Sequence, residues 1–269
     1  MKKLPSIVFL FLLTAVRTSF AAPLIIGDDF TVNGKIIKAS CITEILYVPD
    51  RDSFKLVDCL KDDPKHTAPY TRNEETLDES NYKTEHSYQF LGKIKGDFLL
   101  ISEYWGGGSG RFSSVSLLKP KYENDNLYLT ADKFGYGGDR CGGGISAAEL
   151  RNGILYVTIN LMEADLYREL NGGIQGKEYD VFGFGFSWCA AFKNIKYDFS
   201  SGKEEIVDIT LHENDFYKLA SEKKGDPVAC MNQTIKEEMD AQFVIKPEQF
   251  KSLAEAINTK CASVMKFSN

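Results

Sequence analysis

Residue types that often bind partner molecules gather between positions 104 and 146 of the sequence. The stretch Lys133–Ser146, KFGYGGDRCGGGIS, contains six glycines, and a second glycine-rich stretch runs from Tyr104 to Arg111. If both stretches form the tips of neighbouring hairpins, their side chains meet at one end of a sheet. Exposed tryptophan, tyrosine and arginine side chains dominate the energetics of many protein–protein contacts. The predicted binding residues are Trp105, Arg111, Tyr136, Asp139 and Arg140. The alternative is that the glycines only serve tight turns.

Patterns for nucleophilic and nucleotide chemistry are weak. Ser116 and Lys119 match S-x-x-K, but the companion elements of penicillin-binding enzymes are missing and Ser116 falls in a predicted strand. No Gly-Lys pair is followed by Ser or Thr, as a phosphate-binding loop requires. A glycosidase needs two carboxylates facing across a cleft, and 38 acidic residues single out no pair. Binding is therefore favoured over catalysis, and a hydrolase with paired carboxylates is the alternative.

Metal-binding patterns are equally weak. The three histidines are far apart in the sequence, and no His-Glu-x-x-His motif or Cys-x-x-Cys pair is present. The acidic turns at Asp50 and Asp62 lack the spacing of a calcium-binding loop. We therefore expect no metal and no cofactor.

The N-terminus has the layout of a secretory signal peptide. Lys2 and Lys3 precede an apolar run from Ile7 to Val16, and Ser19-Phe20-Ala21 offers small residues at a cleavage site. The apolar run is too short to span a bilayer, so no membrane anchor is expected. The sequence predicts a leader at residues 1–21 and a periplasmic or secreted protein. The short basic start favours a bacterial source.

The charge balance of the remaining chain restricts the partners. The leader carries three of the 32 basic residues and none of the 38 acidic ones. Its removal leaves 29 basic residues and changes the net charge from −6 to −9. An acidic protein does not attract nucleic acid through its overall field. A basic protein partner is compatible with this charge.

The cysteines predict three disulfides, because an even number in an exported chain is typical of an oxidising compartment. Cys41 and Cys59 would pair across a local hairpin, and Cys230 and Cys261 between two helices. Elimination then pairs Cys141 with Cys189, which would fix the glycine-rich stretch to the sheet. The six residues are Cys41, Cys59, Cys141, Cys189, Cys230 and Cys261.

The elements that carry these residues are mainly β. A turn followed by an apolar strand occurs three times, at intervals of about 28 residues, which predicts an antiparallel meander in a barrel, a sandwich or a propeller-like fold. The three units are Gly96–Ile101, Asp125–Leu129 and Asn152–Val157. Further strands are expected at Lys35–Tyr47, Phe54–Leu60, Phe182–Cys189 and Glu204–Leu211. Residues 61–87 are nearly free of aliphatic side chains and are predicted to be a polar loop.

The pattern becomes helical near the C-terminus. Asp226-Pro227 and Pro247 are typical helix starts. The apolar positions of the second helix share one face. They are Phe250, Leu253, Ile257, Cys261 and Val264. The sequence thus predicts a β domain at residues 22–217 and a helical appendage, a disulfide-linked helical hairpin, at residues 218–269.

Together these features predict an exported protein-binding protein. An inhibitor or immunity-type protein that neutralises an envelope-acting enzyme would fit the disulfides, the exposed aromatic and arginine side chains and the acidic charge. Such an enzyme would be basic. A secreted hydrolase that acts on cell-wall or carbohydrate substrates is the alternative, and the oligomeric state stays open.

Overall fold

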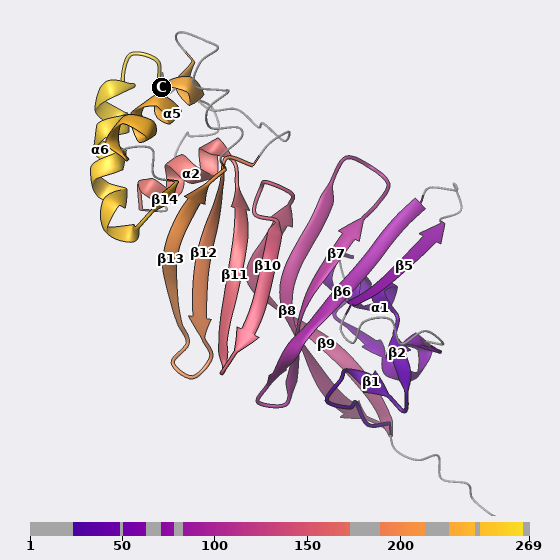
Figure 1. The fold of residues 1–269 in the computed structure, drawn as a ribbon. Helices are drawn as coiled ribbons and strands as arrows, with labels where there is room; N and C mark the ends of the chain where they lie inside the picture. Colours follow the sequence, from indigo (N-terminus) through magenta and orange to yellow (C-terminus); the bar gives the residue numbers. More distant parts are fainter. Residues whose placement is uncertain are drawn as a thin grey trace, which may run out of the picture.

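The computed structural model describes residues 24–48, 51–62, 71–77, 83–172, 189–212, 226–239 and 243–265. This part of the chain is mainly β, as predicted, with three antiparallel sheets and four α-helices (Figure 1). None of the sheets that these residues form closes into a barrel. The predicted leader and most of the predicted strand Phe182–Cys189 lie outside the described residues.

The N-terminal part forms a small sheet beside a short helix. Its elements are β1 (Thr31–Val32), β2 (Lys35–Ile37), α1 (Ala39–Tyr47), β3 (Ser53–Lys55), the 3-10 helix η1 (Leu56–Cys59) and β4 (Leu60–Asp62). Strands β1 and β2 are joined by Asn33 and Gly34, with φ angles of 52° and 76°. The Asn-Gly pair favours this mirror-image turn, the kind that places both central residues at positive φ.

The predicted strands Lys35–Tyr47 and Phe54–Leu60 are largely wrong. Residues 39–47 form α1, and its buried side chains include Ala39, Ile42, Thr43 and Leu46. Their spacing of three, one and three residues places them on one helical face, which packs on the sheet beneath. Packing of this face therefore outweighs the strand preference of the β-branched residues. The disulfide Cys41–Cys59 is confirmed, but it joins α1 to η1 rather than two strands.

The largest sheet has six strands in the order β3-β9-β8-β7-β6-β5. Its further strands are β5 (Thr71–Leu77), β6 (Lys83–Ile94), β7 (Asp97–Trp105), β8 (Arg111–Glu123) and β9 (Asn126–Asp139). The predicted polar loop at 61–87 is wrong where β5 pairs with β6, from Thr71 opposite Gln89 to Leu77 opposite Lys83. Backbone hydrogen bonds to β6 stabilise this edge strand, so it needs few aliphatic side chains.

A second sheet of five strands follows in the order β10-β11-β12-β13-β14. Its elements are β10 (Ile145–Arg151), β11 (Ile154–Leu161), α2 (Glu163–Leu170), β12 (Ala191–Asp198), β13 (Lys203–Leu211) and β14 (Val244–Ile245). The meander is confirmed, since each of the three predicted turn-and-strand units begins β7, β9 or β11. The strand expected at Glu204–Leu211 is β13.

Both faces of the six-stranded sheet are covered. Leu100 and Leu118 face the core beneath α1. Their neighbours Leu99 and Leu117 face the core shared with the five-stranded sheet. The two larger sheets therefore pack against each other in a sandwich-like arrangement, with the N-terminal elements on the far side of the first sheet (Figure 1).

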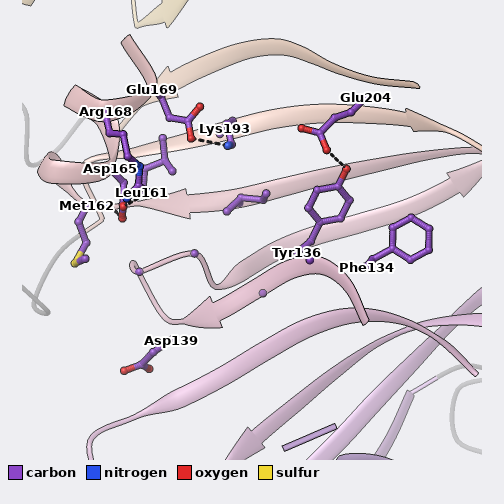
Figure 2. Close-up of a pocket in the computed structure, with 15 residues that line it drawn as sticks. Phe134, Tyr136, Asp139, Leu161, Met162, Asp165, Arg168, Glu169, Lys193 and Glu204 are labelled. Carbon is purple, nitrogen blue, oxygen red and sulfur yellow. Dashed lines mark hydrogen bonds and ion pairs between the residues drawn. The ribbon is translucent and has the colours of Figure 1, made fainter. Parts of the chain in front are cut away.

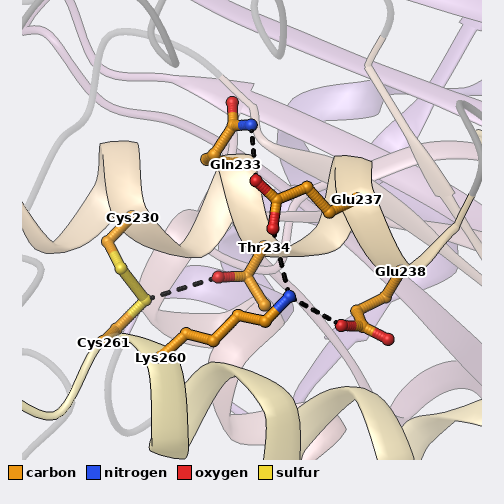
Figure 3. A network of polar contacts seen from close by, with 7 residues as sticks. All are labelled: Cys230, Gln233, Thr234, Glu237, Glu238, Lys260 and Cys261. Carbon is orange, nitrogen blue, oxygen red and sulfur yellow. Dashed lines mark hydrogen bonds and ion pairs between the residues drawn. A yellow bond between two sulfur atoms is a disulfide. The ribbon is translucent and has the colours of Figure 1, made fainter.

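The predicted helical hairpin is confirmed. It consists of α5 (Pro227–Glu238), a 3-10 turn η2 (Pro247–Gln249) and α6 (Phe250–Lys260). The Asp226 side chain accepts a hydrogen bond from the Val228 amide at 2.9 Å and caps α5. Cys230 and Cys261 form the predicted disulfide, next to the ion pairs between Lys260 and the end of α5 (Figure 3). None of the helices in the described ranges is both long and apolar enough to cross a membrane.

Candidate functional site

Four of the five predicted binding residues meet where β7 and β9 end and β8 begins. Trp105 lies opposite Arg111, and Asp139 lies opposite Phe112. The Arg111 amide donates to the Asp139 carboxylate at 2.6 Å, and the Arg140 amide donates to the Arg111 carbonyl at 3.0 Å. We define the tip surface as Trp105, Arg111, Phe112, Asp139 and Arg140.

Two side-chain contacts orient residues of the tip surface. The Trp105 indole N–H donates to the Gly108 carbonyl at 2.6 Å within its own hairpin loop. Arg111 forms an ion pair with Glu85 at 3.1 Å, and its side chain remains 56% exposed. Trp105, Arg111 and Glu85 are cross-strand neighbours and therefore share one face of the sheet. This face presents an indole and a guanidinium side by side.

The opposite face of the same strand ends is aromatic. Tyr104 stacks on Tyr47 of α1, with ring centroids 5.6 Å apart, and Phe112 lies against Tyr47 at 6.4 Å. Phe112 is 40% exposed, an unusual position for a phenylalanine in a strand. The sequence analysis missed Phe112, because an apolar residue inside a strand is expected in a core. Its place directly after Arg111, at the start of the strand, was the available signal.

The glycine-rich stretch is a tight crossing between the two larger sheets. A Cβ atom on Gly138 would lie 2.1 Å from the Gly142 carbonyl oxygen, and one on Gly144 would lie 2.3 Å from the Arg140 oxygen. The Gly143 amide donates to the Asn160 carbonyl of β11 at 3.1 Å. These close backbone approaches are possible only without side chains. The glycines of this crossing therefore allow the backbone to pack closely.

The predicted disulfide Cys141–Cys189 is confirmed, with the two Cα atoms 4.7 Å apart. It connects this crossing to the start of β12. The loop is thus held covalently as well as by hydrogen bonds.

Tyr136 does not belong to the tip surface. Ser116 pairs with Lys133 and Ser114 pairs with Gly137, so residues 134–136 bulge out opposite Val115. The bulge turns Tyr136 toward the second sheet, where its hydroxyl donates a hydrogen bond to the Glu204 carboxylate (Figure 2). Burial, and then the hydrogen bond to Glu204, raises the pKa of the Tyr136 phenol well above its ordinary value. The phenol therefore keeps its proton and acts as a donor.

A cavity of about 700 Å³ lies beside Tyr136, between the bulge of β9, the glycine-rich crossing, α2 and the second sheet (Figure 2). Two acid–base pairs form part of its wall. Glu169 contacts Lys193 at 2.7 Å, and Asp165 contacts Arg168 at 2.6 Å. The side chains of Glu169 and Lys193 are only 13% and 16% exposed. Asp139 also lines the cavity, which therefore adjoins the tip surface.

Other residues considered for chemistry have structural roles. Ser116 is fully buried in β8, so it is inaccessible to a substrate. His86 is buried between hydroxyl groups, with Nδ1 2.6 Å from the Thr43 oxygen and Nε2 3.1 Å from the Thr84 oxygen. Within the described ranges, no three His, Cys, Asp or Glu side chains are grouped as metal ligands. His66 lies outside those ranges.

The sequence did not predict the cavity, because its charged residues come largely from α2, β12 and β13, which are distant from the glycine-rich stretch in the sequence. The only local signal was the pair of glycines, Gly135 and Gly137, on either side of Tyr136. Comparison with family models, curated proteins and solved structures gives no match, so the functional inference rests on the geometry of these sites.

Proposed function

We propose that this chain is an exported protein-binding protein that uses the tip surface to neutralise a basic, envelope-acting enzyme. The observation that carries the proposal is the tip surface itself, where Arg111 and Phe112 are exposed and the half-buried Trp105 lies opposite Arg111. Aromatic and arginine side chains on a preorganised surface lose little conformational freedom on binding.

The covalent framework supports an extracytoplasmic location. Three disulfides link the described residues, and such bonds persist in oxidising compartments. Together with the signal-peptide pattern at residues 1–21, they favour the bacterial periplasm or the exterior. A small enzyme inhibitor in these compartments gains from a rigid scaffold, because rigid surfaces bind with a smaller entropic cost.

The charge supports a basic enzyme as the partner. The sequence carries 38 acidic residues against 32 basic ones, and the predicted leader contains only basic charges. An acidic protein attracts a basic enzyme at long range and so accelerates their encounter. Because salt screens this attraction, the association rate should fall as ionic strength rises. A muramidase is a candidate for such a basic, envelope-acting enzyme.

The proposal is tested with purified basic muramidases and residues 22–269 of the chain. We expect a stoichiometric complex and inhibition of peptidoglycan hydrolysis. The triple variant Trp105→Ala, Arg111→Ala, Arg140→Ala should raise the inhibition constant at least about tenfold, since truncated hot-spot residues commonly cost this much. Tyr122→Ala is the matched control, because Tyr122 is 63% exposed near the opposite end of β8.

Two results would contradict the proposal. One is that none of the muramidases is bound or inhibited by the wild-type chain. The other is that the triple variant, folded as judged by circular dichroism, inhibits as well as Tyr122→Ala does.

A further inference from the structure

The cavity beside Tyr136 has an apolar wall and a polar wall that adjoin each other. Ile159, Leu161 and Met162 contribute the apolar wall from β11 and the residue that follows it. Next to it, the side chains of α2 and β12 present fixed polar groups, and Lys193 is paired directly with Ile159 in the strand ladder (Figure 2). Its volume of about 700 Å³ lies within the usual range of small-molecule pockets. Such a cavity suits a ligand with both an apolar face and several polar groups.

The charges in the polar wall are already neutralised. Glu169 is paired with Lys193, and Asp165 with Arg168, so each pair offers donors and acceptors without a net charge. A bare cation or anion gains little from such pairs, because its own counter-charge is taken. Hydroxyl groups, by contrast, can donate to the carboxylates and accept from the ammonium or guanidinium groups.

The remaining carboxylates disfavour an anion. Asp139 and Glu204 also line the cavity, and both accept hydrogen bonds from neutral donors, the Arg111 amide and the Tyr136 hydroxyl. Within the described part of the chain the cavity therefore contains four carboxylates and two cationic side chains. A phosphorylated or acidic ligand would be repelled.

Aromatic rings complete the cavity. Phe134 and Tyr136 both line it, and their ring centroids are 6.1 Å apart. Phe134 is held in turn by edge contacts with Tyr197 and Phe199 at 5.1 and 5.2 Å. These contacts fix an aromatic surface of the kind that packs on the C–H face of a sugar ring.

From this arrangement we propose that the cavity binds a neutral, hydroxyl-rich ligand, namely a short oligosaccharide. The aromatic and apolar walls contact the C–H faces of the sugar rings. The Glu169–Lys193 and Asp165–Arg168 pairs exchange hydrogen bonds with the hydroxyl groups. This inference does not depend on the proposed binding of an enzyme at the tip surface.

The test measures binding of neutral trisaccharides by isothermal titration calorimetry. The probes are maltotriose, cellotriose and the trimer of N-acetylglucosamine. The trimer of galacturonic acid is the anionic probe. We expect at least one neutral trimer to bind, and to bind more tightly than the anionic trimer, which the carboxylates of the cavity repel.

A double variant, Glu169→Gln with Lys193→Met, removes one buried pair and nearly preserves its volume. It should fold, since replacing both partners of a buried ion pair is usually tolerated. We expect it to weaken the binding of the neutral trimer about tenfold or more, as two charge-assisted contacts are lost. The Trp105, Arg111 and Arg140 triple variant should bind the sugar as the wild type does, which separates this site from the tip surface.

Three outcomes would overturn the inference. The first is the absence of heat with all three neutral trimers up to about 10 mM, a range that reaches very weak affinities. The second is preferential binding of the anionic trimer, and the third is unchanged affinity in the double variant. If the chain bound a neutral trimer but did not bind a muramidase, only the proposed function would be contradicted.

Discussion

At the residue scale, glycines of the two glycine-rich stretches differ sharply in the room they have for a side chain. Gly138 has no room for a Cβ atom, because the Gly142 carbonyl oxygen would lie 2.1 Å away. Gly138→Ala should therefore lower the free energy of unfolding by about 1–3 kcal/mol, the usual cost of overpacking. Urea unfolding followed by tryptophan fluorescence measures this change.

Gly108 is the matched control for that substitution. It lies in the hairpin loop of the tip surface, and a Cβ atom there would have no neighbour within 4 Å. Gly108→Ala should leave the free energy of unfolding within a few tenths of a kcal/mol of the wild type or raise it slightly. Equal destabilisation by both substitutions would show that the crossing is not closely packed.

The positions of four of the five proposed binding residues could be predicted from the sequence. Trp105, Arg111, Asp139 and Arg140 meet as expected, because strand pairing brings the ends of consecutive hairpins together. Tyr136 departs from them because residues 134–136 bulge out of the ladder, and its hydroxyl bonds to Glu204 of the second sheet. Strand patterns assume a regular ladder, so they miss a side chain that a bulge turns toward another sheet.

At the element scale, the covalent link between α5 and α6 should contribute strongly to stability. Cys230 and Cys261 are 31 residues apart, and closing a loop of this length in the unfolded chain contributes about 3–4 kcal/mol in the entropic treatment. Replacing both by serine should lower the free energy of unfolding by about that amount. Guanidinium unfolding of the double variant measures the loss.

Lys260 offers a control within the same hairpin. Its ion pairs with Glu237 and Glu238 are solvent-exposed, so Lys260→Ala should leave stability close to the wild-type value (Figure 3). A larger loss from Lys260→Ala than from the cysteine variant would contradict the dominant role of the disulfide.

Turns and helix starts that depend on a few neighbouring residues could be predicted from the sequence. Elements that depend on packing against distant residues could not. The turns at Asn33 and Asn152, and the capped start of α5 at Asp226, formed as expected because their signals act within a few residues. Helix α1 lacks a side-chain cap at Lys38 and is rich in β-branched residues. Only its contact with the sheet selects the helix, and a sequence does not display that contact.

At the scale of the whole molecule, both faces of the six-stranded sheet are buried in hydrophobic cores. This burial should determine which strands unfold locally first and which last. Strands β7 and β8 lie within the sheet and place side chains in two different cores. Their amides should exchange most slowly with solvent, since exposing them requires both cores to open. The short edge strand β14 should exchange much faster.

Hydrogen exchange followed by mass spectrometry checks this order. Peptides that cover residues 98–101 and 115–118 should remain protected longest. Slower exchange in β12 and β13 would instead show that the second sheet forms the most stable part of the molecule.

Each of the three disulfides also closes a covalent ring in the polypeptide, and the segments between the rings are held by the backbone alone. The rings span residues 41–59, 141–189 and 230–261. A protease that cuts one peptide bond inside a ring leaves the polypeptide in one covalent piece, whereas a cut at residues 60–140 or 190–229 separates it into two. The part of the glycine-rich crossing that follows Cys141 is therefore a place where the backbone can be cut without releasing a fragment until the disulfide is reduced.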